Sequence, residues 1–263
     1  MKAIFTQTGS ELPLVFGHRG YSSRAPENTM AAFELIREHQ IPAVELDVHR
    51  CASGEIVVIH DNSLERTGGI DLPVDKSSLS DLREHEVGSW FDPQFAGERI
   101  PLLDDVLDLL GSDHYLDIEI KPHDGVRGPA HPHSVEWEVV RLVRERGLVS
   151  HVLISSFDPR IVRRVHELAP EIRTAAIYIQ APEMPWFLRR GLGTRMGRAS
   201  AMKPHWKQVT ARSVAMARRR DTPIVTWTVD DPSEALRLAR LGVHGIVSNT
   251  PGEIVSALMV SES

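Results

Sequence analysis

The fold is decided by three consecutive stretches: LVFG at residues 14–17, an amphipathic segment after it, and AVELDV at residues 43–48. The two apolar runs have the length of buried strands, and apolar residues in the segment between them recur with the period of a helix. These residues are Met30, Phe33 and Ile36. Asn28 stands near the start, where it can cap exposed backbone N–H groups. The stretch predicts a strand–helix–strand unit.

The same alternation continues to the end of the chain. Further strands are expected at residues 115–120, 152–155, 175–179, 199–202, 224–228 and 245–247, which makes eight in all. Helices between them begin at Asp158-Pro159 and Asp231-Pro232, where a capping carboxylate precedes a proline, and a further helix covers residues 134–146. Alternating strands and helices imply parallel strands joined by crossovers. Eight such units predict a closed α/β barrel.

Two segments interrupt this rhythm. Gly54 lies in a turn after the second strand, so residues 55–59 are expected to fold back as a hairpin. Residues 61 to about 103 are too long for an ordinary loop. They contain enough apolar residues for a small satellite cluster, namely Leu79, Leu82, Trp90, Phe91 and Phe95. We expect one domain over residues 1–263, with an insertion at the barrel mouth.

Composition limits the possible partners. The chain has 263 residues, which suits one α/β barrel, and a formal net charge of -6 with both signs spread along it. It lacks the basic footprint of a nucleic-acid-binding protein, so nucleic acid is not an expected partner. Cys51 is the single cysteine, which rules out an internal disulfide and suits a reducing compartment. The first seven residues turn polar too early for a signal peptide, and no apolar run could span a membrane. We expect a soluble cytoplasmic protein; its oligomeric state is left open.

Carboxylates on two strands indicate a charged site. Glu45 and Asp47 are two residues apart, so both side chains leave one strand face, which in a closed barrel can be the inner face. Buried carboxylates side by side require a cation or a shared proton. Asp117 and Glu119 repeat the spacing on the next strand. Such oxygen-rich sites suit the hard cations Mg²⁺ or Ca²⁺, although a single carboxylate is more often a surface group or an ion-pair partner.

Two histidines stand at strand ends. His18 follows the first strand and His60 follows the hairpin strand, and the carboxyl ends of barrel strands form the active site. A histidine pair can divide proton removal and proton donation. Among thirteen histidines most are structural, and the positions of these two at strand ends favour function. Arg19 beside His18 and Lys121 after Glu119 suggest an anionic substrate, although Arg19 could equally pair with a barrel carboxylate.

A set of short motifs is spread over nearly the whole chain: GHRG at 17–20, PENT at 26–29, ELDV at 45–48, VIHDN at 58–62, LERT at 64–67, IPLL at 100–103, DIEIKP at 117–122, SSF at 155–157, TWTVD at 226–230 and SNTP at 248–251. In their order and spacing these motifs resemble the glycerophosphodiester phosphodiesterase family, relatives of phosphatidylinositol-specific phospholipase C. Asp230 departs from the pattern, because asparagine is common there.

The resemblance implies a TIM (β/α)8 barrel that hydrolyses glycerophosphodiesters to an alcohol and glycerol 3-phosphate. It implies that His18 and His60 are the acid/base pair and that the divalent metal ligands are Glu45, Asp47 and Glu119. Arg19 is implied to contact the phosphate, with Lys121 and Trp227 near the substrate. Trp227 either packs on the glycerol or fills the barrel rim. The nucleophile is either water or the glycerol hydroxyl next to the phosphate, and attack by that hydroxyl forms a cyclic phosphate.

Two other functions remain open. A lysophospholipase D would use the same site on a diester carrying an acyl chain, and the apolar stretch at residues 184–188 could hold that chain. We prefer to interpret this stretch as an ordinary barrel helix. A catalytically silent barrel that binds phosphodiesters is the other alternative, and the presence of both histidines and all three acids counts against it.

Overall fold

A computed structural model describes residues 12–123 and 128–260. Its strands form one sheet in the order β7-β6-β5-β4-β2-β1-β9-β8, in which all neighbours are parallel. Isolated parallel bridges between Met202 and Ile224 and between His205 and Trp227 join β7 to β8. This pairing closes the expected (β/α)8 barrel. The strands are β1 (Leu14–His18), β2 (Ala43–Arg50), β4 (Tyr115–Ile120), β5 (Val152–Ser156), β6 (Arg173–Tyr178), β7 (Ala201–Pro204), β8 (Val225–Thr226) and β9 (Gly245–Ser248).

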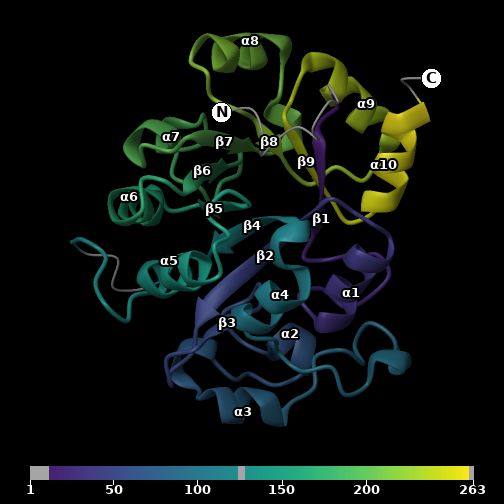
Figure 1. Cartoon of the computed structure of the whole chain (residues 1–263), viewed down its shortest axis with the longest axis vertical. Helices are drawn as coiled ribbons and strands as arrows, with labels where there is room; N and C mark the ends of the chain where they lie inside the picture. Colours follow the sequence, from purple (N-terminus) through teal and green to yellow (C-terminus); the bar gives the residue numbers. More distant parts are fainter. Residues whose placement is uncertain (1–11, 124–127, 261–263) are drawn as a thin grey trace.

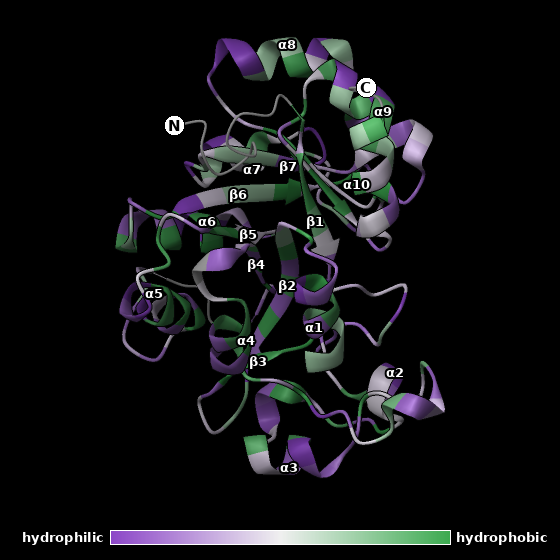
Figure 2. Ribbon diagram, turned by 45° about the vertical axis from the view of Figure 1, so that its right-hand side comes forward, coloured by the Kyte–Doolittle hydropathy of each residue, from purple (hydrophilic) through white to green (hydrophobic). Residues whose placement is uncertain are grey.

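Helices surround the barrel (Figure 1). They are α1 (Met30–Glu38), α4 (Leu103–Leu110), α5 (Val135–Glu145), α6 (Pro159–Leu168), α7 (Leu192–Met196), α8 (Ala211–Arg219), α9 (Pro232–Leu241) and α10 (Pro251–Val260). Hydrophilic and hydrophobic residues alternate along them in Figure 2, as expected for helices with one face on a barrel. The proposed caps are confirmed, since the side chains of Asp158 and Asp231 accept hydrogen bonds from Arg160 N and Ser233 N. The longest described helix has 11 residues, and no described helix could cross a membrane.

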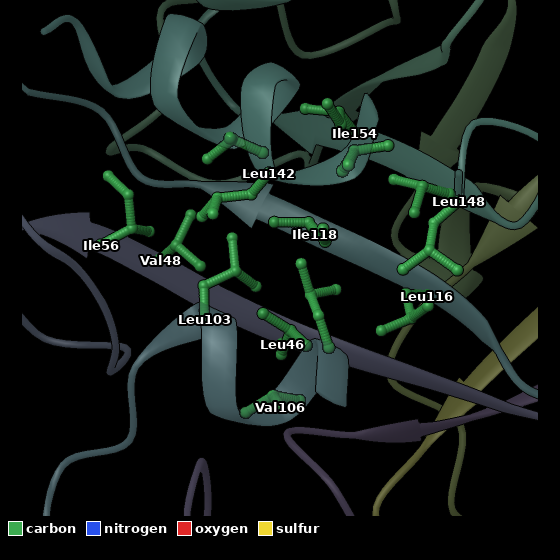
Figure 3. Packing of buried hydrophobic residues seen from close by; sticks show 14 of the residues in the cluster. Leu46, Val48, Ile56, Leu103, Val106, Leu116, Ile118, Leu142, Leu148 and Ile154 are labelled. Atoms are coloured by element: carbon green, nitrogen blue, oxygen red, sulfur yellow. The ribbon is translucent and has the colours of Figure 1, made fainter. Parts of the chain in front are cut away.

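The two-residue period of the strands separates a core from a site. The sheet register aligns Leu46 with Ile118 and Ile118 with Ile154, and all three are buried among helix residues. Figure 3 shows these side chains between the strands and residues of α4 and α5 such as Leu103 and Leu142. The intervening strand residues therefore point into the barrel. The part of the interior nearer the amino ends of the strands is apolar. Its cluster consists of Leu14, Phe16, Ala43, Leu153, Ala175, Ala201, Val225 and Val247.

The hairpin and the long segment after it form a separate unit of packing. β3 (Ile56–Val58) pairs antiparallel with β2, as expected. The segment then contains α2 (Glu65–Gly68), η1 (Val74–Lys76), α3 (Leu79–Glu84) and η2 (Pro93–Phe95). Its core is a cluster of Cys51, Val57, Ile59, Leu64, Val74, Leu82, Val87 and Ile100. Leu82 joins this cluster as expected, whereas Trp90, Phe91 and Phe95 pack edge to face on one another nearer the surface.

Three local predictions were wrong. Thr29, not Asn28, caps α1 by accepting a hydrogen bond from Ala32 N. The strand expected at residues 199–202 lies two residues later, in β7, because the chain runs without regular structure through residues 199 and 200. Residues 184–188 do not form a barrel helix, and α7 begins only at Leu192. The shift of β7 brings Lys203 into the strand, a residue that the sequence did not single out.

Candidate active site

The four strand carboxylates form two layers inside the barrel. The register pairs Glu45 with Asp117 and, one layer nearer the carboxyl ends, Asp47 with Glu119. All four residues are buried, with at most 5% of their surface exposed. One oxygen each of Glu45, Asp47 and Glu119 lies within 4.8 Å of the others, so these three could hold a metal ion. Residue spacing alone left Asp117 and Glu119 equivalent, and the structure separates them.

Asp117 is held by a lysine that the sequence analysis missed. Lys203 is 2% exposed on β7. Its Nζ lies 2.8 Å from Asp117 Oδ2 and 3.4 Å from Glu45 Oε1, and it donates a hydrogen bond to Ser155 Oγ over 3.2 Å. Ser155 Oγ in turn donates to Asp117 Oδ1. Burial would lower the pKa of Lys203, but Asp117 and Glu45 raise it, so the side chain stays a cation.

The upper layer contains two more cations. Lys121 Nζ lies 2.7 Å from Asp47 Oδ1 and 2.6 Å from Glu119 Oε1. Arg19 Nε lies 3.2 Å from Asp47 Oδ2, and its Nη1 donates to Glu27 over 2.7 Å. Burial would raise the pKa of Asp47, yet Lys121 and Arg19 hold that pKa well below its ordinary value. The ion pair that the sequence analysis kept open for Arg19 is therefore present.

Asn28 supports Asp47 from the first βα loop. Its Nδ2 donates to Asp47 Oδ2 over 2.9 Å, and Asp47 N donates to Asn28 Oδ1. Asn28 has a left-handed backbone with φ of 56°, a conformation that asparagine tolerates better than most residues. The side chain is only 3% exposed. Asn28 therefore orients a site carboxylate instead of capping the helix that follows.

His18 is oriented by a chain of hydrogen bonds. Asn249 donates from its backbone N and its Nδ2 to Asp230, over 2.7 Å each, which turns Asn249 Oδ1 toward His18. His18 Nδ1 is 2.7 Å from that oxygen, so it carries the proton. Nε2 is left as the acceptor and lies 3.9 Å from Glu45 Oε2. Burial and the charge of Arg19 lower the pKa of His18 to about 4, so the ring is neutral at pH 7.

His60 has a carboxylate as its partner. Its Nδ1 lies 2.6 Å from Asp61 Oδ1, and Arg66 Nε donates to the other oxygen of Asp61 over 2.7 Å. About a third of the His60 side chain is exposed, with a relative area of 33%. Burial and the charge of Lys121 lower its pKa, while Asp47 and Asp61 counter this effect. The Asp61 carboxylate fixes the ring, and the net effect of these surroundings is a pKa below the ordinary value of histidine.

The donor set fits a hard divalent cation. Burial raises the pKa of Glu45 to about 7 and also raises that of Glu119, and repulsion from Asp47 adds to both shifts. Among the described side chains of the two layers, four carboxylates face three cations, so negative charge is in excess. Three buried carboxylate oxygens are ligands that Mg²⁺ and Ca²⁺ prefer.

Trp227 lies at the rim, outside the acidic layers. Its Nε1 donates to Lys203 O over 3.0 Å, and its ring packs edge to face on Phe157 and His205. The ring is half-buried in these contacts, which fit a residue that fills the rim, and its packing on the glycerol stays a prediction. Of the eight residues that sequence reasoning proposed, Glu45, Asp47 and Glu119 lie inside the barrel on β2 and β4, and the other five lie at or after the ends of strands.

This arrangement defines a class of protein. A closed (β/α)8 barrel with buried acids, cations and two oriented histidines at the carboxyl ends of its strands is a barrel enzyme. More particularly, the chain belongs to the glycerophosphoryl diester phosphodiesterase family, a family of phosphoric diester hydrolases, whose model matches residues 18–253.

Similar proteins agree with this assignment. A glycerophosphodiester phosphodiesterase of Caldanaerobacter subterraneus is 32% identical over 244 residues, which cover 92% of this chain and 96% of that protein. A glycerophosphodiester phosphodiesterase of Bacillus subtilis is 28% identical, covering 90% of this chain and 84% of its own. A structure of an Oleispira antarctica phosphodiesterase in complex with the product sn-glycerol-3-phosphate has a TM-score of 0.78 and 28% identity, covering 94% and 97% of the two chains.

Proposed function

We propose that this protein hydrolyses glycerophosphodiesters to an alcohol and glycerol 3-phosphate. The observation that carries the proposal is the buried acidic cluster of Glu45, Asp47 and Glu119, with His18 beside it. Family membership and the glycerol 3-phosphate bound to the Oleispira relative support the substrate class. We further propose that residues 1–263 act as one domain and that the protein is cytoplasmic. Cell fractionation would test the location.

Glu45, Asp47 and Glu119 would hold a divalent cation, Mg²⁺ or Ca²⁺. When bound, the ion supplies positive charge to the phosphate oxygens and lowers the barrier to attack at phosphorus. Lys121 and Arg19 bring two further cations to the same carboxylates. Their free N–H groups would contact the phosphate, and Arg19 in particular offers a planar donor fork. Trp227 would border the glycerol.

The histidines would divide the proton transfers. His18 is neutral with its Nε2 lone pair free, so it would accept a proton from the nucleophile. The nucleophile's oxygen then bonds to phosphorus as the ester P–O bond breaks. His60, whose protonated ring Asp61 stabilises, would donate a proton to the leaving alkoxide. The nucleophile is water or the glycerol hydroxyl next to the phosphate, and ³¹P NMR detection of a cyclic phosphate would identify the second route.

The test is release of glycerol 3-phosphate from a panel of glycerophosphodiesters with Mg²⁺ or Ca²⁺, before and after chelation. We expect metal-dependent turnover that His18→Ala and His60→Ala each lower by about 10² to 10⁴, because a positioned acid or base contributes about that much. A Glu34→Ala protein is the control, since Glu34 is exposed on α1, outside the acidic layers. No release with any metal would leave a phosphodiester-binding barrel as the better description.

Lysophospholipase D activity is the second candidate. The observation that favours it is the exposure of Trp186 and Phe187 in the loop after β6, where an acyl chain could lie. Turnover of glycerophosphocholine and lysophosphatidylcholine should be compared under identical conditions. A strong preference for the lipid would replace the first proposal.

A further inference from the structure

A fixed aromatic turn projects from the loop after β6. Leu188 N donates to Pro185 O over 2.8 Å, so Trp186 and Phe187 occupy the two central positions of a turn. Trp186 is 79% exposed and Phe187 is 40% exposed. The two rings pack edge to face with centroids 5.9 Å apart. Trp186 is the most exposed large hydrophobic side chain in the part of the chain that the structure describes.

The turn is held firmly from below. Met184 and Leu188 on either side of the rings are buried in a core cluster of the barrel. Arg189 ties the loop together, because its guanidinium donates to the carbonyl oxygens of Met184 and Pro182 over 2.8 and 2.9 Å. Gln208 Nε2 donates to Arg189 O over 2.7 Å and links the loop to the segment after β7. The exposure of Trp186 is therefore a built feature of the fold.

The surface around the turn is basic, although the chain as a whole carries a net charge of -6. Residues 183–198 contain four arginines and a single acidic residue, Glu183. Arg190 and Arg195 are exposed and form no ion pair with any described residue. Leu192 and Met196 on α7 add exposed apolar surface between these charges. Unpaired arginines beside exposed aromatic rings suit a partner that is both apolar and anionic.

The turn lies beside the active-site opening. It follows the carboxyl end of β6, as Arg19, Lys121 and Trp227 follow the carboxyl ends of β1, β4 and β8. The cluster that buries Met184 and Leu188 also packs against Phe157, which contacts the rim residue Trp227. A surface seated on the turn would thus face the barrel mouth.

We propose that the Trp186–Phe187 turn, with Arg190 and Arg195, docks the barrel mouth onto an anionic lipid bilayer. Aromatic rings favour the interfacial region of a membrane, and arginines are attracted to anionic headgroups. A two-fold dimer through this patch is disfavoured, because it would oppose the same arginines of two copies. The inference goes beyond the proposed hydrolysis, which a diester free in solution could undergo without docking.

The test is co-sedimentation of the full chain with vesicles of phosphatidylcholine, with or without phosphatidylglycerol, at low ionic strength. We expect binding only to the vesicles that contain phosphatidylglycerol, and loss of binding at high salt. Trp186→Ala combined with Phe187→Ala should weaken binding by about tenfold or more, because two interfacial anchors are lost. Arg190→Glu should weaken it by about tenfold, because a basic charge near the surface is replaced by an acidic one.

Met216→Ser on α8 is the matched control, since Met216 is 41% exposed but lies outside the patch. It should bind like the unmodified protein. Turnover of soluble glycerophosphocholine should stay unchanged in the Trp186 and Arg190 variants, so failure of docking and failure of the proposed hydrolysis are distinguishable. Absence of binding to phosphatidylglycerol vesicles overturns the proposal. So does equal binding by the double variant, or a dimer in gel filtration that the double variant abolishes.

Discussion

Replacing Lys203 by methionine removes the cation from the layer formed by Glu45 and Asp117, while keeping a side chain of similar length. The ammonium now lies 2.8 Å from Asp117 Oδ2 and 3.4 Å from Glu45 Oε1. Asp117 is 0% exposed, and Ser155 Oγ also donates a hydrogen bond to it, over 2.6 Å. Leaving a buried charge without its partner costs about 3–5 kcal/mol. At about 2–4 °C per kcal/mol for a chain of this size, the midpoint of thermal unfolding should fall by roughly 6–20 °C.

The matched rescue is the Lys203→Met, Asp117→Asn double variant. It removes both charges and keeps an acceptor for Ser155, so we expect it to recover most of the lost stability. Lys76→Met is the control, because Lys76 is exposed and its replacement should change stability by less than about 0.5 kcal/mol. Thermal and urea unfolding in EDTA would measure all four proteins. A loss below about 1 kcal/mol for Lys203→Met, or no recovery in the double variant, would refute the role of Lys203 as the countercharge.

Four further predictions follow from the site and the core. Because the pKa of His18 is about 4 when folded and about 6.5 when unfolded, protons bind the unfolded chain first as the pH falls. Between pH 7 and pH 5 in EDTA, His18 should therefore account for a loss of about 2 kcal/mol, which His18→Gln should lack in urea titrations. Mg²⁺ or Ca²⁺ should raise the unfolding midpoint, and Glu119→Gln should reduce that rise; an equal rise would exclude Glu119 as a ligand. Asn28→Ala should weaken metal binding by about 10–100-fold in calorimetry, since it removes the hydrogen bond to Asp47. Ile118→Ala should destabilise the fold by about 2–5 kcal/mol in urea unfolding, because Ile118 is fully buried between β2, β5 and the helices.

The barrel and its acidic layers follow from short-range patterns. The two-residue period of a strand separates Glu45 and Asp47 from Leu46 whatever the strand packs against, so the pattern predicts which side chains share a face. Helix starts at Asp158 and Asp231 are likewise local, because a cap satisfies N–H groups two or three residues away. Features of this kind need no knowledge of the rest of the chain.

Lys203 shows where local patterns fail. A lysine near the end of a short strand is usually exposed, and the segment before it contains Ala199 and Ser200, which gave no sign that the strand starts later. Its burial depends on β7 closing the barrel, which brings residue 203 beside residues 45 and 117. Asn28 was misassigned for the same reason, because a cap and a ligand to a distant carboxylate look identical in sequence.

By itself, the sequence determined the barrel class, which residues of each strand share a face, and which acids and histidines to consider. These depend on spacing within one element and on the family pattern. The family pattern already pointed to Glu45, Asp47 and Glu119, and only the tertiary structure shows why Asp117 is set apart from them, since Lys203 pairs with it. The stagger of β2 against β4 puts Asp47 level with Glu119, and closure at β7 gives Asp117 its own lysine. These outcomes depend on distances between residues far apart in the chain, which no local pattern encodes.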